Sequence, residues 1–199
     1  MDIPFRMLGL QYPLDAECSV GSVYSQMWTP DYNPAGCPAS SFITLHYGPT
    51  GKNGVPLEMT WMDGGIRPSH PDIIPANSDI GGDDSANGVM MIGEKGITTT
   101  NINDSSPLMP KLYRYDGTTE FGPEVEEMIE PEYGHQRKWV DACKAGFNSK
   151  EHMGLTSSFD YAGPMTETVL MGNLAIRSFM LREEKENGKM DYYARKKLL

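Results

Sequence analysis

The sequence lacks the features that mark several large classes of protein. It has three cysteines among 199 residues, none in a Cys-x-x-Cys spacing, which argues against a disulfide framework and against a zinc site. No apolar run approaches the roughly 18–20 residues that a membrane-spanning helix needs, so we expect no membrane span. The formal charge is −10, which would repel a nucleic-acid backbone, and we therefore expect no nucleic-acid partner.

Motifs for self-contained catalysis are also missing. No Gly-x-Gly-x-x-Gly follows a predicted strand, no Gly-x-Ser-x-Gly forms a nucleophile elbow, and no pair of histidines has metal-ligand spacing. We therefore expect this chain to bind neither a nucleotide cofactor nor a metal by itself. The sequence does not indicate a compartment, and the cytoplasm and the periplasm both remain open.

What is present is typical of one globular domain. Hydrophobic residues make up 39% and charged residues 22% of the chain, close to ordinary globular values, and the length suits a single domain spanning residues 1–199. The 21 glycines and 15 prolines predict many turns and long loops around a sheet.

The first two thirds of the chain predict β-hairpins. The turns GPTGKNG and GEKG each lie between apolar runs of strand length. A looser alternation begins at Asp15, and one further short strand could extend the second hairpin. The strand ranges expected from these patterns are 15–27, 42–47, 55–61, 89–92, 97–102 and 111–115.

The last third predicts helices. Residues 133–145 carry Trp139, Val140 and Cys143 on one side, and Gly146 follows as a C-terminal cap. A second apolar-periodic run begins near Asp160, with Pro164 either as the first residue of the main helix or as a kink in it. A short strand at 190–194 could follow. The order of elements predicts an α+β fold, with a large, mostly antiparallel open sheet and helices packed on one face.

The stretch MDGGIRPSHPD, residues 62–72, is the main candidate for a binding site. Arg67 could clamp a carboxylate or bond sugar hydroxyls, with Asp63 and His70 beside it. The alternative interpretation is a surface turn shaped by glycine and proline, with solvated charges. His135 lies near the start of a predicted helix, and His46 lies inside a strand pattern, where we expect it to pack or to form a hydrogen bond.

Three segments in this order and spacing resemble one family: WMDGGIRPSHPD, GHQRKWVDACKAG and SSFDYAGPMTETVLMGNLAIRS. Together they are similar to the C-terminal domain of the Gfo/Idh/MocA oxidoreductases, in particular to a bacterial subgroup of NADH-dependent dehydrogenases. The resemblance covers nearly the whole chain, from Asp2 to about Leu199. No single segment is specific, but their combination is.

The resemblance implies the substrate half of a two-domain enzyme. In the family, an N-terminal Rossmann domain binds NAD(P) and carries a Glu-Lys-Pro lysine that assists proton transfer, and the second domain is α+β. The family moves a hydride between the nicotinamide and a hydroxyl-bearing carbon, usually of a sugar or cyclitol. Some relatives use the same chemistry to cleave glycosidic bonds. Homo-oligomers commonly form through the open sheet face, and the expected substrate contacts here are Asp63, Arg67, His70 and His135.

The chain also departs from the family pattern. The Rossmann fingerprint and the Glu-Lys-Pro motif are absent, so NAD or NADP is expected only in a full-length protein. The family's Asp-x-x-x-His-x-x-Asp stretch would end at Asp2, a catalytic position, while its histidine would precede Met1. We therefore expect a substrate-binding and oligomerisation domain that is inactive alone. The alternative is a free-standing carbohydrate-binding or dimerisation module without redox chemistry.

Overall fold

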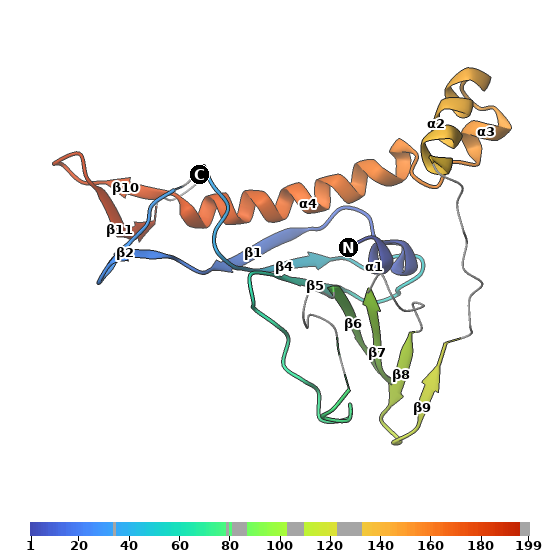
Figure 1. Ribbon diagram of the computed structural model, residues 1–199, viewed down its shortest axis with the longest axis horizontal. Coiled ribbons are helices and arrows are strands. Elements are labelled where there is room, and N and C mark those ends of the chain that lie inside the picture. The colour runs from blue at the N-terminus through green and yellow to red at the C-terminus, as the bar shows by residue number, and fades with distance from the viewer. Residues whose placement is uncertain (34, 79, 81–86, 103–109, 123–132, 196–199) are drawn as a thin grey trace. The chain divides into compact units, whose positions relative to one another are not determined.

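The structure is a computed structural model that describes residues 1–199 except 34, 79, 81–86, 103–109, 123–132 and 196–199 (Figure 1). The chain divides into two compact units, one made of Met1–Pro68 with Gly163–Leu199 and the other of Ser69–Ala162. Each unit is described by itself. Among the described residues all strand pairs are antiparallel and no sheet closes on itself. The predicted α+β class with open, antiparallel strands is thereby confirmed, but the described strands form four separate sheets, the largest of four strands, rather than one large sheet.

The first unit is built on a three-stranded sheet in the order β1-β4-β5. The predicted hairpin around GPTGKNG is confirmed, because β4 and β5 pair along their whole length, with His46 opposite Glu58. A short helix precedes the sheet and ends at Gly9, whose φ of 63° is the left-handed cap conformation. The elements of this unit are α1 (Asp2–Leu8), β1 (Asp15–Val20), β2 (Tyr24–Gln26), β3 (Thr29–Pro30), β4 (Ser41–Tyr47), β5 (Leu57–Met62), β10 (Arg182–Glu184) and β11 (Met190–Arg195).

Helix α4 (Phe159–Met180) begins in the second unit and continues into the first, where it packs on one face of this sheet (Figure 1). Alternate residues of β4 point to that face, and Ile43, Leu45 and Tyr47 are all buried. A Cβ placed on Gly172 would lie 3.4 Å from Ile43 Cδ1, so the missing side chain lets helix and strand approach closely.

Pro164 lies inside α4, five residues after the helix begins, so it is not the first residue of the helix. The Thr168 hydroxyl donates to the Pro164 carbonyl at 3.0 Å and accepts from the Tyr47 hydroxyl at 3.3 Å. Thr168 is fully buried. A polar side chain in this core is therefore satisfied by one bond within its own helix and one to the sheet.

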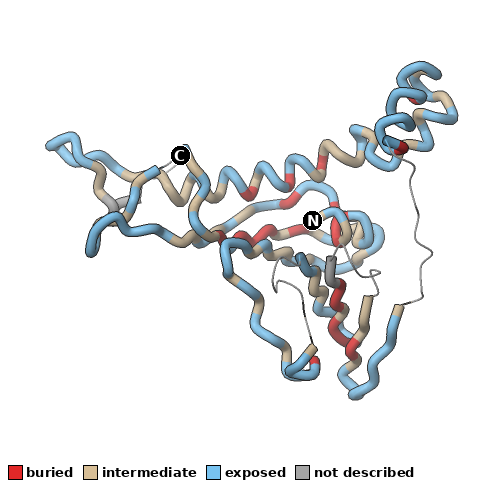
Figure 2. Tube along the Cα trace, viewed as in Figure 1, coloured by how far each residue is buried: buried red, intermediate tan, exposed pale blue. Residues whose placement is uncertain are grey.

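The second unit contains a four-stranded meander in the order β6-β7-β8-β9. The predicted hairpin around GEKG and the strand that extends it are confirmed, while β9 is an additional strand. Ile97 and Tyr113 from the sheet form a buried cluster with Ile74 from the preceding loop, and Figure 2 shows the buried stretch along β7. The elements are β6 (Asn87–Gly93), β7 (Gly96–Ile102), β8 (Lys111–Arg114), β9 (Thr119–Phe121), α2 (Gly134–Ala145) and α3 (Lys150–Met153).

Helix α2 occupies the range that the sequence predicts and ends at Gly146, with φ of 92°. Its predicted apolar side is exposed: Trp139 keeps 60% and Val140 39% of its surface, and Cys143 is exposed as well. The residues of α2 that are buried are Gly134 and Ala142. Helix α2 therefore contributes few buried side chains to the second unit.

Candidate functional site

The candidate stretch 62–72 begins with an anchored carboxylate. The backbone N–H of Ser41 donates to Asp63 Oδ1 at 2.7 Å, and the indole N–H of Trp61 donates to Asp63 Oδ2 at 3.1 Å. The Asp63 N–H donates in turn to the Ser41 carbonyl at 3.1 Å. Asp63 thus joins the end of β5 to the start of β4, and both of its carboxylate oxygens already accept a bond from the protein.

Gly64 turns the chain away from the sheet directly after this anchor. Its φ is 62°, and a Cβ on it would lie 2.2 Å from the Ala39 carbonyl oxygen. A side chain at this position would have to displace backbone. Gly65 has φ of 88° but no atom within 4 Å of its Cβ position, so only its conformation favours glycine. The turn is closed by the Ile66 N–H, which donates to the Asp63 carbonyl at 3.2 Å.

The far end of the stretch is anchored by packing. The Ile74 N–H donates to the Pro71 carbonyl at 3.0 Å and closes a turn. Ile74 is 2% exposed and lies in the core of the second unit. His70 is exposed, and its Nε2 lies 3.2 Å from the Ser78 carbonyl. The stretch is thus anchored at one end in the first unit and at the other end in the second unit.

The five predicted site residues are distributed over both units. Asp63 and Arg67 belong to the first unit, as does Asp2, exposed in the first turn of α1. His70 and His135 belong to the second unit, the latter exposed in the first turn of α2. Arg67 is exposed just before the boundary at Pro68. Their assembly into one substrate site stays a prediction.

A second cluster of titratable groups lies on the sheet of the first unit, on the face opposite α4. His46 Nδ1 lies 2.5 Å from Asp15 Oδ1, and His46 Nε2 lies 3.9 Å from Glu58 Oε2. The hydrogen bond to Asp15 raises the pKa of His46, desolvation opposes this, and the charges of Asp15, Glu58 and Glu17 raise it further. The prediction that His46 is hydrogen-bonded is confirmed.

Sequence reasoning missed the carboxylate partners of His46. The turn between the two strands of the hairpin does fix their register, and counting back from it places Glu58 opposite His46. Nothing comparable locates Asp15, because residues 21–40 separate its strand from β4 and the strand alternates only loosely.

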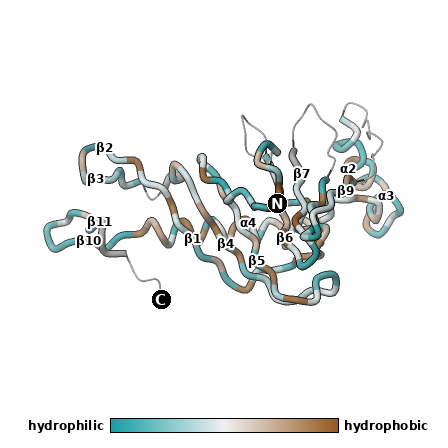
Figure 3. Tube along the Cα trace, turned by 90° about the horizontal axis from the view of Figure 1, so that it is seen from below, coloured by the Kyte–Doolittle hydropathy of each residue, from teal (hydrophilic) through white to brown (hydrophobic). Residues whose placement is uncertain are grey.

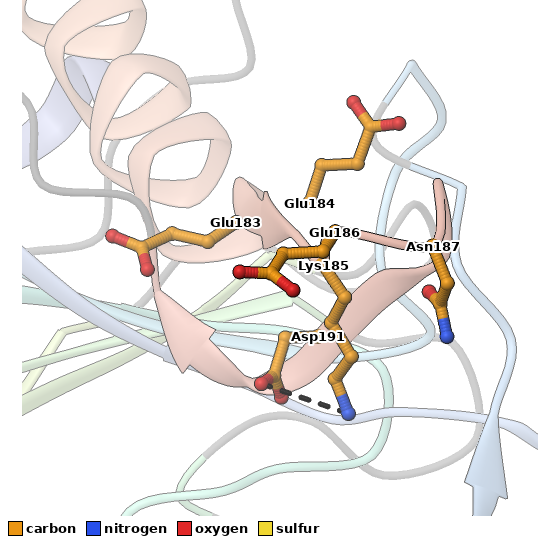
Figure 4. A pocket seen from close by; sticks show the side chains of 6 residues that line it. All are labelled: Glu183, Glu184, Lys185, Glu186, Asn187 and Asp191. Carbon is orange, nitrogen blue, oxygen red and sulfur yellow. Dashed lines mark ion pairs between the residues drawn. The ribbon is translucent and has the colours of Figure 1, made fainter.

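The hairpin of β10 and β11 carries an open acidic hollow (Figure 4). Its lining includes the carboxylates of Glu183, Glu184, Glu186 and Asp191, and Lys185 Nζ lies 3.7 Å from Asp191 Oδ2. Figure 3 shows that the turn of this hairpin is hydrophilic. All six residues that line the hollow are charged or polar, so solvated side chains at a hairpin turn account for it.

Some kinds of site are absent from the part of the chain that the structure describes. There, no group of three or more histidine, cysteine or carboxylate side chains is arranged to hold a metal ion. None of the helices described combines the length and apolar content that crossing a bilayer requires. A scan against protein-family models found no matching family, and a search of curated proteins found no significant match.

Proposed function

We propose that this chain is the C-terminal substrate-binding and oligomerisation domain of an NAD(P)-dependent dehydrogenase that acts on a sugar or cyclitol hydroxyl. The observation that carries the proposal is the ordered set of three segments that resembles the Gfo/Idh/MocA oxidoreductases. Their positions in the fold support it: WMDGG ends β5 and opens the candidate loop, GHQRKWVDACKAG coincides with α2, and AGPMTE lies in α4. An α+β fold with open antiparallel sheets is compatible with that domain.

The candidate loop supports binding of a polyhydroxylated ligand. Arg67 is exposed and carries a planar set of donors that suits hydroxyl or carboxylate oxygens. His70 is also exposed and can donate or accept one bond, according to its protonation. In this proposal Asp63 acts chiefly by holding the loop, since its oxygens bond to Ser41 and Trp61.

The described residues do not contain the strand-to-helix arrangement of a Rossmann site. A Rossmann site places the pyrophosphate at the start of a helix that directly follows a parallel strand. Here all described strand pairs are antiparallel, and Gly64 and Gly65 lead from β5 into a turn rather than a helix. In this proposal the cofactor binds to another domain. This chain binds the substrate and orients its hydroxyl.

The proposed oligomer contact is the face of the β1-β4-β5 sheet opposite α4. Phe42 of β4 points to that face and is 36% exposed, and Met62 lies opposite it on β5. Helix α4 packs on the other face of this sheet, so this apolar pair is compatible with contact to a second copy.

The experiment is to express the complete reading frame that contains this chain and to assay reduction of NAD⁺ and NADP⁺ with a panel of sugars and cyclitols. This chain alone is assayed beside it. Turnover by the complete protein and none by the chain alone is the expected result. Saturable NADH binding by the chain alone, or a reading frame without a nucleotide-binding segment, would overturn the proposal. The second of these results would favour a carbohydrate-binding or dimerisation module.

A further inference from the structure

His46 is held between carboxylates from both strands that flank it. Asp15 of β1 and Glu58 of β5 are its direct cross-strand partners in the sheet register. The two ring nitrogens face different strands, Nδ1 toward Asp15 at 2.5 Å and Nε2 toward Glu58 at 3.9 Å. The imidazole side chain is 38% exposed, so protons from solvent reach it.

We propose that His46 is a proton-dependent clamp across the three-stranded sheet, joining β1 and β5 to β4 when both ring nitrogens carry hydrogen. The neutral ring can keep only one N–H, and it keeps the bond to Asp15, which is the shorter. Nε2 then presents a lone pair to the Glu58 carboxylate, which repels it. Loss of one proton therefore turns the contact with β5 from attractive to repulsive.

The charges around the ring set the pH range of the clamp. The charged groups that act on the imidazole are Asp15 and Glu17 from β1 and Glu58 from β5, all of them negative. The hydrogen bond to Asp15 raises the pKa of His46 above about 6.5, its ordinary value. A group whose pKa is raised by folding binds its proton more tightly in the folded state. The stabilisation is therefore complete below about pH 6.5 and is lost as the pH rises through the higher folded-state pKa.

The clamp is independent of the proposed dehydrogenase role, because it concerns only the stability of the sheet. The first test is an NMR titration of the four histidines in the full chain. The His46 signal, assigned by its loss in His46→Gln, should titrate above the reference of about 6.5. In Asp15→Asn its midpoint should fall back toward that reference. A His46 midpoint at or below the reference in the unaltered chain would overturn the proposal, whatever the variants do.

The second test is thermal unfolding of the unaltered chain and of His46→Gln between about pH 6 and pH 8.5, where aspartate and glutamate stay ionised. The other three histidines are present in both proteins, so the difference in Tm reports His46. We expect that difference to favour the unaltered chain most at the acidic end and to shrink as the pH rises. When both proteins also carry Glu58→Gln, the difference in Tm between them should depend less on pH. A difference that stays constant or grows with pH would contradict the clamp.

Discussion

The two units build their cores in different ways. In the first, the buried residues of β4 face α4, a helix of 22 residues that approaches the sheet at Gly172. In the second, Ile97 and Tyr113 of the meander are covered partly by a loop, which contributes Ile74. The segment that begins as the candidate loop thus continues into the core of the second unit, so packing also constrains its sequence. Four sets of substitutions test this comparison, in order of decreasing expected effect.

Leu45→Ala should have the largest effect. Leu45 has no exposed surface, and deleting a buried leucine side chain costs roughly 2–5 kcal/mol through lost transfer energy and a residual cavity. Chemical denaturation measures this cost. Leu174→Ala is the matched control, because Leu174 of α4 is 66% exposed and surface changes usually stay within about 0.5 kcal/mol. Equal losses in the two variants would refute the assignment of β4 and α4 as the core of this unit.

Ile74→Ala should destabilise the second unit by about 2 kcal/mol, the lower end of the range for buried aliphatic side chains, because a loop can relax around the cavity. Hydrogen exchange resolves the effect by residue, and protection should fall in β7 and β8. Ile92→Ala, at a position 68% exposed, is the control. If Ile74→Ala behaved like Ile92→Ala, the loop would not be part of the core.

Gly64→Ala should cost about 1–3 kcal/mol, the cost of forcing a side chain into a strained backbone region. A Cβ there meets the Ala39 carbonyl oxygen at 2.2 Å. Gly65 also has a positive φ, but a Cβ on it would meet no atom within 4 Å. Gly65→Ala should therefore cost less than Gly64→Ala. Comparing the two Tm values separates the collision from the conformational strain. A larger loss for Gly65→Ala would show that the contact between the loop and Ala39 is wrong.

Asp63→Asn should cost about 1 kcal/mol, since it weakens hydrogen bonds to a charged acceptor at an exposed position. Arg67→Ala should leave the free energy of unfolding nearly unchanged but weaken binding of a sugar-like ligand. Denaturation and calorimetric titration of both variants give the two readouts. If Arg67→Ala lost stability and Asp63→Asn only affinity, the roles assigned to these residues would have to be exchanged.

The hairpins could be predicted because their turns lie between strand-length apolar runs, and the α+β class follows from their order. Strand β9 was missed, although Asp116 and Gly117 before it are typical hairpin-turn residues and Asp116 Oδ1 accepts from the Thr118 N–H at 2.9 Å. The burial of Ile74 could not be predicted, because it follows from the tertiary packing of a loop and not from a periodic apolar pattern. The exposure of Trp139 in α2 could not be predicted either, since periodicity identifies an apolar side but not what covers it.

The candidate site shows the same limit. The sequence identifies Asp63, Arg67 and His70 as polar groups in one loop, but not that Asp63 bonds to Ser41 from a strand 22 positions earlier. Chemical type and spacing can select residues. Their hydrogen-bond partners depend on strand register, which only the folded sheet supplies.

The most direct test of the proposal that this chain holds substrate rather than cofactor is a pair of NMR titrations of the labelled chain, one with a cyclitol such as myo-inositol and related sugars, the other with NADH. The account predicts saturable amide shifts from a sugar or cyclitol that include residues 63–72, and no saturable shifts from NADH. Binding of NADH to that loop, with no response to any of the polyols, would contradict it.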